Sequence, residues 1–324
     1  MIGGLTWLIT GGTGFFGQHF TRYLLDQCHP QSVRIFSRSE SKQAAMVERL
    51  SDSRLRWLIG DVRDGDRLSM ACRGVDVVVH AAALKRVDTC EAQPWEALAT
   101  NVMGTREVMQ ACLDQQVQRA VLLSTDKAPG PETFYGITKL CAERLWVQGN
   151  VYAAGRPTRF AVTRYGNVLG STGSVVELWR SQAAAGGPVT VTDPEATRFW
   201  MTATEGCALV ARALERMQGG ETYVPMIRAA SLGQLMAACV PPDMPMTVTG
   251  LRRSEKRHEV LLTEEERRRA WVSGGDLIVI EPVERSWSDR AVLRSGELLR
   301  VIWASDTVAR YSVDELRAMV MACV

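Results

Sequence analysis

The sequence has few residues of the kinds that usually bind metal ions. It holds only 4 histidines, and its 8 cysteines are dispersed with no pair at the C-x-x-C spacing. Structural zinc sites need compact clusters of these residues, so no metal site is expected. Dispersed, unpaired cysteines are typical of reduced thiols in the cytosol.

Long apolar runs and an excess of one charge are also absent. No apolar run approaches the roughly 20 residues that span a bilayer, so no membrane association is expected. The net charge of +2, with scattered Lys and Arg, gives no whole-chain attraction to nucleic acid. Residues 1–4 lead directly into a glycine loop without a basic leader, which favours a cytoplasmic location.

What is present is an alternation of two kinds of segment. Short apolar runs predict buried strands at residues 5–10, 33–36, 55–59, 75–80, 120–124 and 160–164. Segments of helical period lie between them, at residues 15–27, 94–114 and 135–152. This order predicts an α/β fold with a doubly wound parallel Rossmann sheet.

The alternation weakens after about residue 165, where glycine and proline pairs separate shorter elements. We expect an NADP-binding Rossmann domain over residues 1–165. Residues 166–324 should form mainly a smaller C-terminal substrate lobe, with some segments returning to the first domain. Within residues 263–269, glutamates stand four residues before arginines, which predicts a solvated helix.

A glycine-rich loop follows the first predicted strand. Its G-x-x-G-x-x-G spacing opens a helical segment, and glycines there permit a tight turn and a close backbone approach. The helix N-terminus adds N–H donors and a favourable dipole for a pyrophosphate. We therefore expect dinucleotide binding, with candidate contacts at Gly11, Thr13, Gly14, Phe15, Phe16 and Gly17.

The end of the second strand indicates which dinucleotide binds. An NAD-preferring site commonly offers an acidic side chain to the ribose 2′-hydroxyl at this point, but the chain reads Ser37-Arg38. Arg38 can pair with a 2′-phosphate, helped by Ser37 and Lys42, although an ordinary surface arginine is the alternative. NADP is the expected cofactor. Further candidate cofactor contacts are Asp61, Val62, Ala81, Ala82, Ala83, Lys85, Asn101, Ser124, Tyr135, Lys139 and Tyr165.

Candidate catalytic residues lie at and after the end of the fifth strand. Tyr135 and Lys139 stand four apart on a predicted helix and share one face. A nearby ammonium and a cationic nicotinamide would favour the phenolate of Tyr135, whose ordinary pKa is about 10. Such a Tyr-Lys pair is typical of enzymes that catalyse hydride transfer. Thr125 supplies a hydroxyl at the strand end and joins the candidate catalytic set, and Asp126 and Lys127 follow it directly.

With these residues the chain resembles the extended short-chain dehydrogenase/reductases. The resemblance rests on the loop glycines, on Ser124-Thr125 and on Tyr135 with Lys139. More narrowly, the chain is similar to the inverting UDP-N-acetylglucosamine 4,6-dehydratases that begin pseudaminic acid synthesis. The segments that carry this similarity are residues 80–85, 124–128, 135–139, 164–168, 197–200, 255–256 and 258–259.

The resemblance implies an NADP-dependent nucleotide-sugar dehydratase that works as a homo-oligomer. Tyr135 would accept the proton of the sugar 4-hydroxyl, and Asp126 would protonate the departing C6 hydroxyl. Lys127 would remove the C5 proton, with a pKa lowered by burial and by neighbouring positive charges. Retaining hexose dehydratases carry Asp-Glu where this chain has Asp-Lys, so the lysine implies inversion at C5.

The substrate end of the chain departs from the family's pattern. Candidate substrate contacts are Lys85, Asn167, Arg198, Arg252 and Glu255. Where relatives commonly have an arginine and a proline, this chain has Thr172 and Glu177, and extra arginines appear within residues 252–257. The loop at residues 128–131 is also altered, which could shift Lys127. The identity of the nucleotide sugar therefore stays open.

Two other hypotheses are compatible with these residues. A nucleotide-sugar epimerase or reductase of the same superfamily would use Tyr135 and Lys139, while Asp126 and Lys127 formed a structural ion pair. A catalytically silent NADP-binding sensor or scaffold is the other alternative, because a fold alone never establishes activity. Analysis of the product distinguishes all three hypotheses.

Overall fold

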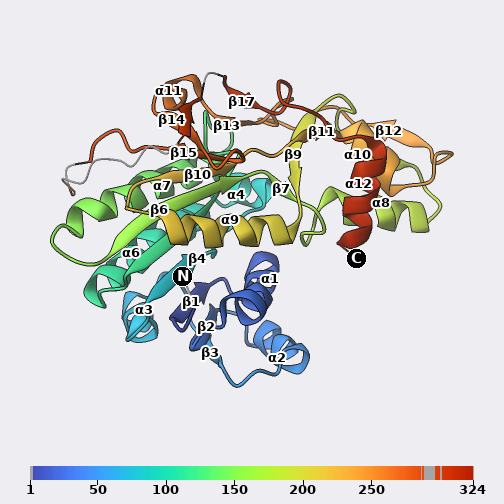
Figure 1. Ribbon diagram of the computed structural model, residues 1–324. Coiled ribbons are helices and arrows are strands. Elements are labelled where there is room, and N and C mark those ends of the chain that lie inside the picture. Colours follow the sequence, from blue (N-terminus) through green and yellow to red (C-terminus); the bar gives the residue numbers. More distant parts are fainter. Residues whose placement is uncertain (1–2, 286, 288–295, 300, 324) are drawn as a thin grey trace.

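The computed structural model describes residues 3–285, 287, 296–299 and 301–323. Figure 1 shows a broad sheet with helices on both faces. A smaller lobe, which contains the C-terminal helix, lies to one side of that sheet.

The main sheet has 10 strands within the described residues, in the order β16-β14-β15-β10-β6-β5-β4-β1-β2-β3. Its parallel part consists of β1 (Thr6–Thr10), β2 (Ser32–Ser37), β3 (Leu55–Ile59), β4 (Val77–His80), β5 (Arg119–Thr125), β6 (Arg159–Tyr165) and β10 (Thr222–Pro225). Antiparallel strands extend it beyond β10, namely β15 (Leu277–Ile280), β14 (Ala270–Ser273) and β16 (Gly296–Leu298). The predicted apolar runs all lie on parallel strands, so the prediction of a doubly wound Rossmann sheet is confirmed.

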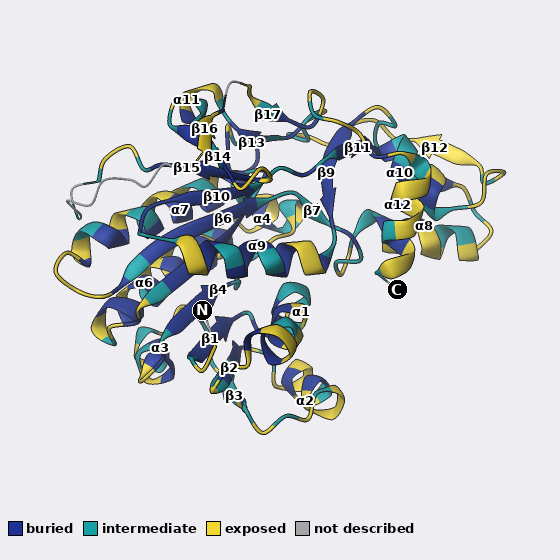
Figure 2. Ribbon diagram, viewed as in Figure 1, coloured by how far each residue is buried: buried dark blue, intermediate teal, exposed yellow. Residues whose placement is uncertain are grey.

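Helices cover both faces of this sheet. One face carries α1 (Phe15–Tyr23) and α9 (Ala203–Arg216), and the other carries α3 (Gly65–Cys72), α6 (Gly104–Asp114) and α7 (Phe134–Tyr152). Successive strand residues point to opposite faces, so Ile9 joins the first apolar cluster and Leu8 the second. Figure 2 shows these strands buried between helices whose outer sides are exposed. Burial on both faces explains why the strands appear in the sequence as continuous apolar runs.

Two of the predicted helices contain a π-helical turn. α1 continues as η1 (Leu24–Cys28), and α5 (Pro94–Leu98) passes through η2 (Ala99–Met103) into α6. Such turns are uncommon and often occur at functional sites, and η2 carries Asn101. The other helices of this half are α2 (Glu40–Arg49) and α4 (Val87–Ala92). Among the described helices, even the 19-residue α7 lacks the apolar length that a bilayer crossing requires.

The smaller lobe has an apolar cluster of its own, which includes Trp179 and Leu235. It contains α8 (Val175–Ala184), α10 (Leu232–Cys239), α12 (Val313–Ala322) and the paired strands β8 (Val189–Val191) and β12 (Met246–Val248). Between lobe and main sheet lie β7 (Asn167–Val168), β9 (Thr197–Met201) and β11 (Ala229–Ser231), which form a small sheet. The paired strands β13 (Val260–Leu262) and β17 (Trp303–Ala304) lie above the main sheet, and α11 (Glu264–Arg267) lies beside β14. β10 is a strand of the main sheet and α9 packs on that sheet, so the chain after residue 165 contributes to the main sheet as well as to the smaller lobe. The domain boundary at residue 165 stays a prediction.

Candidate active site

The glycine loop between β1 and α1 forms a tight backbone cradle. Gly11 has a φ of +67°, and a Cβ there would lie 2.8 Å from the Ala82 Cα. A Cβ on Gly17 would lie 2.5 Å from the Gly12 carbonyl oxygen, so α1 packs directly on the loop. No side chain of the described residues caps the first turn of α1 at Gly14, and its N–H groups are available to a phosphate. This cradle fits the pyrophosphate of a dinucleotide.

Aromatic side chains lie on the α1 side of this loop. Phe16 stacks on Tyr165, at the end of β6, with ring centroids 6.3 Å apart, and Phe15 contacts His19. Thr13 is buried within the loop. Burial raises the pKa of Tyr165, so its hydroxyl stays protonated at neutral pH. The structure therefore brings Tyr165 next to the loop residues that the sequence grouped with it.

Arg38 and Asp61 lie near each other beyond the ends of β2 and β3. Arg38 Nη1 is 3.7 Å from Asp61 Oδ2, whereas Arg63 Nη2 binds the same oxygen at 2.7 Å. Burial disfavours the Asp61 carboxylate, but hydrogen bonds from Arg63 lower its pKa overall. Because Arg63 already pairs with Asp61, the exposed guanidinium of Arg38 is available to a 2′-phosphate.

The other residues predicted at this corner have different surroundings. The Ser37 hydroxyl accepts a 3.1 Å hydrogen bond from Gln43, and Lys42 is exposed on the first turn of α2. The side chain of Val62 packs in the apolar core beside Gly104. Only the backbone of Val62 is therefore placed for a cofactor contact.

Asn101 holds the loop that follows β4, which includes the half-buried Ala81, Ala82 and Ala83. Its Oδ1 accepts a hydrogen bond from the Leu84 N–H at 2.8 Å, and its Nδ2 donates to the Leu84 carbonyl at 2.9 Å. The same Nδ2 donates to Thr138 Oγ1 on α7 at 3.1 Å. Asn101 thus links the loop to the helix that carries Tyr135.

The buried Asp126 and the half-buried Lys127 form an ion pair at the end of β5. Asp126 is 1% exposed, and its Oδ1 accepts hydrogen bonds of 3.0 Å from both Thr125 Oγ1 and Lys127 Nζ. Asp126 Oδ2 and Ser124 Oγ are buried and have no partner among the described residues. Unpartnered buried polar atoms are costly, and these two are suited to contact a bound molecule.

The second partner of Lys127 is Glu259, which the sequence had not placed in the site. Lys127 Nζ lies 3.2 Å from Glu259 Oε1, and Glu259 is only 3% exposed. Burial favours the neutral amine, but the Asp126 and Glu259 carboxylates raise the pKa of Lys127 well above its usual value. The expected lowering of this pKa is therefore wrong for the protein without ligand, because two carboxylates outweigh burial and the positive charge of Arg198.

Tyr135 and Lys139 lie on the first turns of α7, which Thr133 caps. Lys139 Nζ donates to the Leu123 carbonyl at 2.6 Å, and burial lowers the pKa of Lys139 to about 8. Burial raises the pKa of Tyr135 to about 12, and the charge of Lys127 is the largest influence that opposes the rise. The expected lowering of the Tyr135 pKa by Lys139 is therefore wrong for the protein without a bound nicotinamide, because burial has the larger effect.

Gly136 permits the close approach of the Asp-Lys pair to α7. A Cβ on Gly136 would lie 2.2 Å from the Lys127 carbonyl oxygen and 3.0 Å from Pro131. No other residue type fits without moving this loop. Lys256 Nζ also fixes the loop, since it donates to the carbonyls of Pro129 and Gly130.

The predicted substrate residues come from the loop after β4, from β7 and β9, and from the segment between β12 and β13. Arg198 Nη2 binds Glu255 Oε1 at 2.9 Å, and Glu255 Oε2 accepts a hydrogen bond from the exposed Arg252 through its backbone N–H. Asn167 Nδ2 donates to the Phe199 carbonyl. Lys85 Nζ donates to the Thr172 carbonyl at 3.3 Å, and burial lowers the pKa of Lys85.

Sequence reasoning missed Glu259 and Lys256 as members of this cluster. Both stand in the segment that carried part of the family resemblance, which was the one available indication of their importance. Neither has a local spacing that relates it to Asp126 or Lys127, because more than a hundred residues separate them in the chain.

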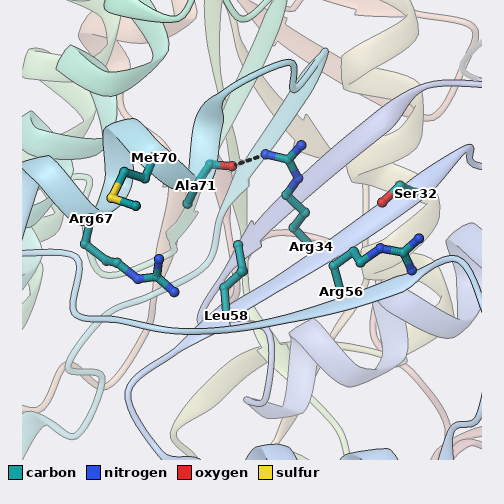
Figure 3. Close-up of a pocket in the computed structure, with 7 residues that line it drawn as sticks. All are labelled: Ser32, Arg34, Arg56, Leu58, Arg67, Met70 and Ala71. Atoms are coloured by element: carbon teal, nitrogen blue, oxygen red, sulfur yellow. Dashed lines mark hydrogen bonds between the residues drawn. The ribbon is translucent and has the colours of Figure 1, made fainter.

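A hollow lined by arginines lies elsewhere, between β2, β3 and α3 (Figure 3). There Arg34 Nη1 donates to the Ala71 carbonyl, and Arg67 Nε donates to the Ile59 carbonyl. It contains none of the predicted site residues. In the described part of the chain, no group of three or more His, Cys, Asp or Glu side chains could hold a metal ion.

The fold and this site define the class of protein. A parallel sheet with a glycine loop after β1, hydroxyls at the end of β5 and a Tyr-x-x-x-Lys pair on α7 is the architecture of an extended short-chain dehydrogenase/reductase. The profile of the family described as polysaccharide biosynthesis protein matches residues 7–280. The chain belongs to this family.

Individual relatives and solved structures agree with this placement. The chain is 42% identical over 267 residues to an inverting UDP-N-acetylglucosamine 4,6-dehydratase of Campylobacter jejuni, which covers 82% of this chain and 80% of the relative. It is 38% identical over 276 residues to a UDP-glucose 4-epimerase of Rickettsia akari, with 83% and 81% covered.

Among solved structures, the X-ray structure of Pen from Bacillus thuringiensis matches with a TM-score of 0.91 at 33% identity, covering 100% of this chain and 98% of that one. The dTDP-glucose 4,6-dehydratase of Streptomyces venezuelae, with NAD and TYD bound, gives a TM-score of 0.70 at 25% identity, with 78% and 86% covered.

Proposed function

We propose that the protein is a nucleotide-sugar 4,6-dehydratase that acts on UDP-N-acetylglucosamine and inverts C5 of the sugar. The observation that carries the proposal is the ion pair between the buried Asp126 and the half-buried Lys127, 3.0 Å apart, whose charges act on Tyr135. An epimerase or reductase needs no acid and base beyond the tyrosine, whereas elimination of water needs both. The high identity to inverting dehydratases supports the same substrate class.

Each side chain has a defined task in this reaction. A nicotinamide held in the cradle after β1 would supply the hydride acceptor for C4 and the hydride donor for C6. Tyr135 accepts the proton of the 4-hydroxyl. Lys139 lies one turn further along α7, where its Nζ donates to the Leu123 carbonyl. The resulting 4-ketone acidifies C5, whose proton goes to Lys127 while Asp126 protonates the C6 oxygen that leaves as water.

The decisive test is mass spectrometry after incubation of the protein with UDP-N-acetylglucosamine. Dehydration should lower the mass of the nucleotide sugar by one water, with no net change in NADPH absorbance. A product of unchanged mass with inverted C4 would identify an epimerase, and consumption of NADPH would identify a reductase. Unchanged substrate with bound NADP would support the silent sensor or scaffold.

We also propose NADP rather than NAD as the cofactor, because Arg38 occupies the position where an acidic residue would favour NAD. Removing its guanidinium in Arg38→Ala should weaken NADP binding at least about tenfold, as expected for a charge-assisted contact of about 1.5–3 kcal/mol. The affinity for NAD should hardly change. Isothermal titration with both dinucleotides measures this, and an equal loss for both would contradict the proposal.

Assembly and location stay predictions of the sequence. We infer a homo-oligomer on the family resemblance, and light scattering of the purified protein gives its mass in solution. A cytoplasmic location is likewise inferred from the dispersed cysteines. Besides the dinucleotide, a nucleotide sugar is the partner that we expect this site to bind.

A further inference from the structure

Glu259 is held rigidly beside the catalytic pair although it comes from a distant part of the chain. It directly precedes β13, and its N–H donates to Ser305 Oγ at 2.9 Å. The Ser305 N–H donates back to the Glu259 carbonyl at 2.8 Å. These two hydrogen bonds fix the backbone, so the carboxylate cannot easily withdraw from Lys127.

The cluster contains more buried negative charge than its lysine can balance. Asp126 and Glu259 both bind Lys127 Nζ, at 3.0 and 3.2 Å, and each has a second buried oxygen with no partner among the described residues. Arg198 is the other cation that lowers the pKa of Glu259, but it already pairs with Glu255 at 2.9 Å. Burial and the charge of Asp126 raise the pKa of Glu259, which favours its protonated form.

The ion pair as it stands is not ready for elimination. A lysine held as ammonium cannot accept the C5 proton, and an ionised Asp126 cannot protonate the C6 oxygen. Transfer of one proton from Lys127 Nζ to Asp126 Oδ1 would give a neutral amine that can accept the C5 proton and a carboxylic acid that can protonate the C6 oxygen. A second ionised carboxylate at 3.2 Å opposes this transfer, since it stabilises the ammonium.

We propose that Glu259 is a positioning residue that acts through Lys127, and that its protonation converts the Asp126–Lys127 ion pair into a neutral acid and a neutral base. The proposal rests on the dehydratase function proposed above. When Glu259 carries a proton, Asp126 alone of these two carboxylates still stabilises the Lys127 ammonium, so transfer of the lysine proton to Asp126 across 3.0 Å becomes more favourable.

The protons balance over the elimination step. Neutral Lys127 takes the proton from C5, and protonated Asp126 gives its proton to the C6 oxygen as the C6–O bond breaks and water leaves. The electron pair of the C5–H bond forms the C5–C6 double bond. The pair ends as ammonium and carboxylate, its starting form, while Glu259 keeps its proton throughout.

The first test compares the pH dependence of kcat in the wild type and in Glu259→Gln, whose side chain is permanently uncharged. Wild-type dehydration should fall as pH rises through the raised pKa of Glu259, and in Glu259→Gln this alkaline fall should move up by at least about one pH unit, with KM changed less than about twofold. Glu259→Asp, which keeps the charge, should keep the alkaline fall.

Glu221→Gln is the matched remote control. Glu221 is another nearly buried carboxylate whose pKa burial raises, but it lies at the start of β10 and pairs with Arg285. The pH dependence of kcat in Glu221→Gln should match that of the wild type. Either an unchanged alkaline limb in Glu259→Gln or loss of elimination at every pH would overturn the proposal. The second result would mean that the carboxylate itself reacts.

A second measurement needs no turnover, so it separates this proposal from the dehydratase assignment. Competitive acetylation, read by peptide mass spectrometry, gives the pH at which Lys127 becomes reactive in the cofactor-loaded protein. In Glu259→Gln, and in Glu259→Met should the first variant fold poorly, that pH should fall by at least about one unit. An unchanged value would refute the role of Glu259, whereas a wild type that releases no water would refute only the dehydratase function.

Discussion

At the residue scale, two lysines of the site titrate in opposite directions. Lys127 lies between two carboxylates, which raise its pKa, whereas Lys139 has the Leu123 carbonyl as its hydrogen-bond partner and a pKa lowered to about 8. Burial penalises both ammonium groups, so the neighbouring charges decide the outcome. The sequence identifies both lysines but not this difference, because Glu259 reaches Lys127 only through the fold.

Replacing Lys139 should separate stability from activity. The folded-state pKa of about 8 lies below the ordinary value of about 10.4, so keeping Lys139 protonated costs stability below pH 8 and this cost disappears as pH rises toward 10. Lys139→Met should raise the free energy of unfolding at pH 7 by about 2 kcal/mol and abolish turnover. Urea unfolding at pH 7 and pH 10 measures the effect. A less stable variant at pH 7 would contradict the stated cause.

At the element scale, α11 differs from the solvated helix that its charge pattern predicted. Of the two surface pairs that the spacing predicted, Arg269 binds Glu265 at 3.2 Å, whereas Glu264 binds Arg267 at 2.5 Å in place of Arg268. Glu266, however, points inward and binds the buried Arg164 at 2.9 Å. Spacing of charges shows which residues share a helix face, but not that another element contributes a buried arginine to it.

The buried pair of Glu266 and Arg164 should dominate the stability of this region. Burial opposes ionisation of Glu266, but Arg164 lowers the pKa of its carboxyl overall, so its contribution exists above about pH 4.3 and is lost at lower pH. Glu266→Gln should lower the free energy of unfolding at pH 7 by about 3 kcal/mol, with a smaller difference at pH 3. Glu264→Gln, which breaks a surface pair, should leave Tm unchanged. Equal effects of both variants in thermal melts would argue against this role.

The start of α7 offers a second prediction at this scale. In Gly136→Ala the new methyl group would lie 2.2 Å from the Lys127 carbonyl, so the loop and the lysine must move. A displacement of about 1 Å can lower a rate about a hundredfold, and we expect that loss in kcat. Gly187→Ala meets open space and should have no effect. Steady-state kinetics measure the loss, and circular dichroism verifies that both variants fold. Full activity in Gly136→Ala would contradict this account.

At the scale of the whole molecule, the site is assembled from segments far apart in the chain. The β5 end supplies Asp126 and Lys127, α7 supplies Tyr135, and the segment before β13 supplies Glu259. Lys256 joins that segment to the loop at Pro129 and Gly130. The glycine loop of the cofactor cradle lies between β1 and α1, and it makes no contact with the Lys127–Glu259 or Lys256 interactions.

Loosening the connection at Lys256 should therefore affect the sugar end alone. Lys256→Met removes the hydrogen bonds to the loop beside Lys127, so kcat should fall and KM should rise together, each by several-fold. The Kd for the dinucleotide should stay the same, because the glycine loop is not touched. Fluorescence titration and steady-state kinetics on one preparation measure both, and a weakened Kd would show that the two parts of the site are coupled.

The sequence by itself determined the Rossmann sheet, the glycine cradle and the Tyr135–Lys139 pair, because apolar period and residue spacing act over a few neighbouring positions. Its resemblance to the inverting dehydratases added Asp126 and Lys127 to the site. Only the tertiary structure decided that Glu259 joins them and that Tyr135 and Lys127 have raised pKa values. Burial and charge depend on which distant segments meet in space. The proton state of the site therefore became visible only once the chain was folded.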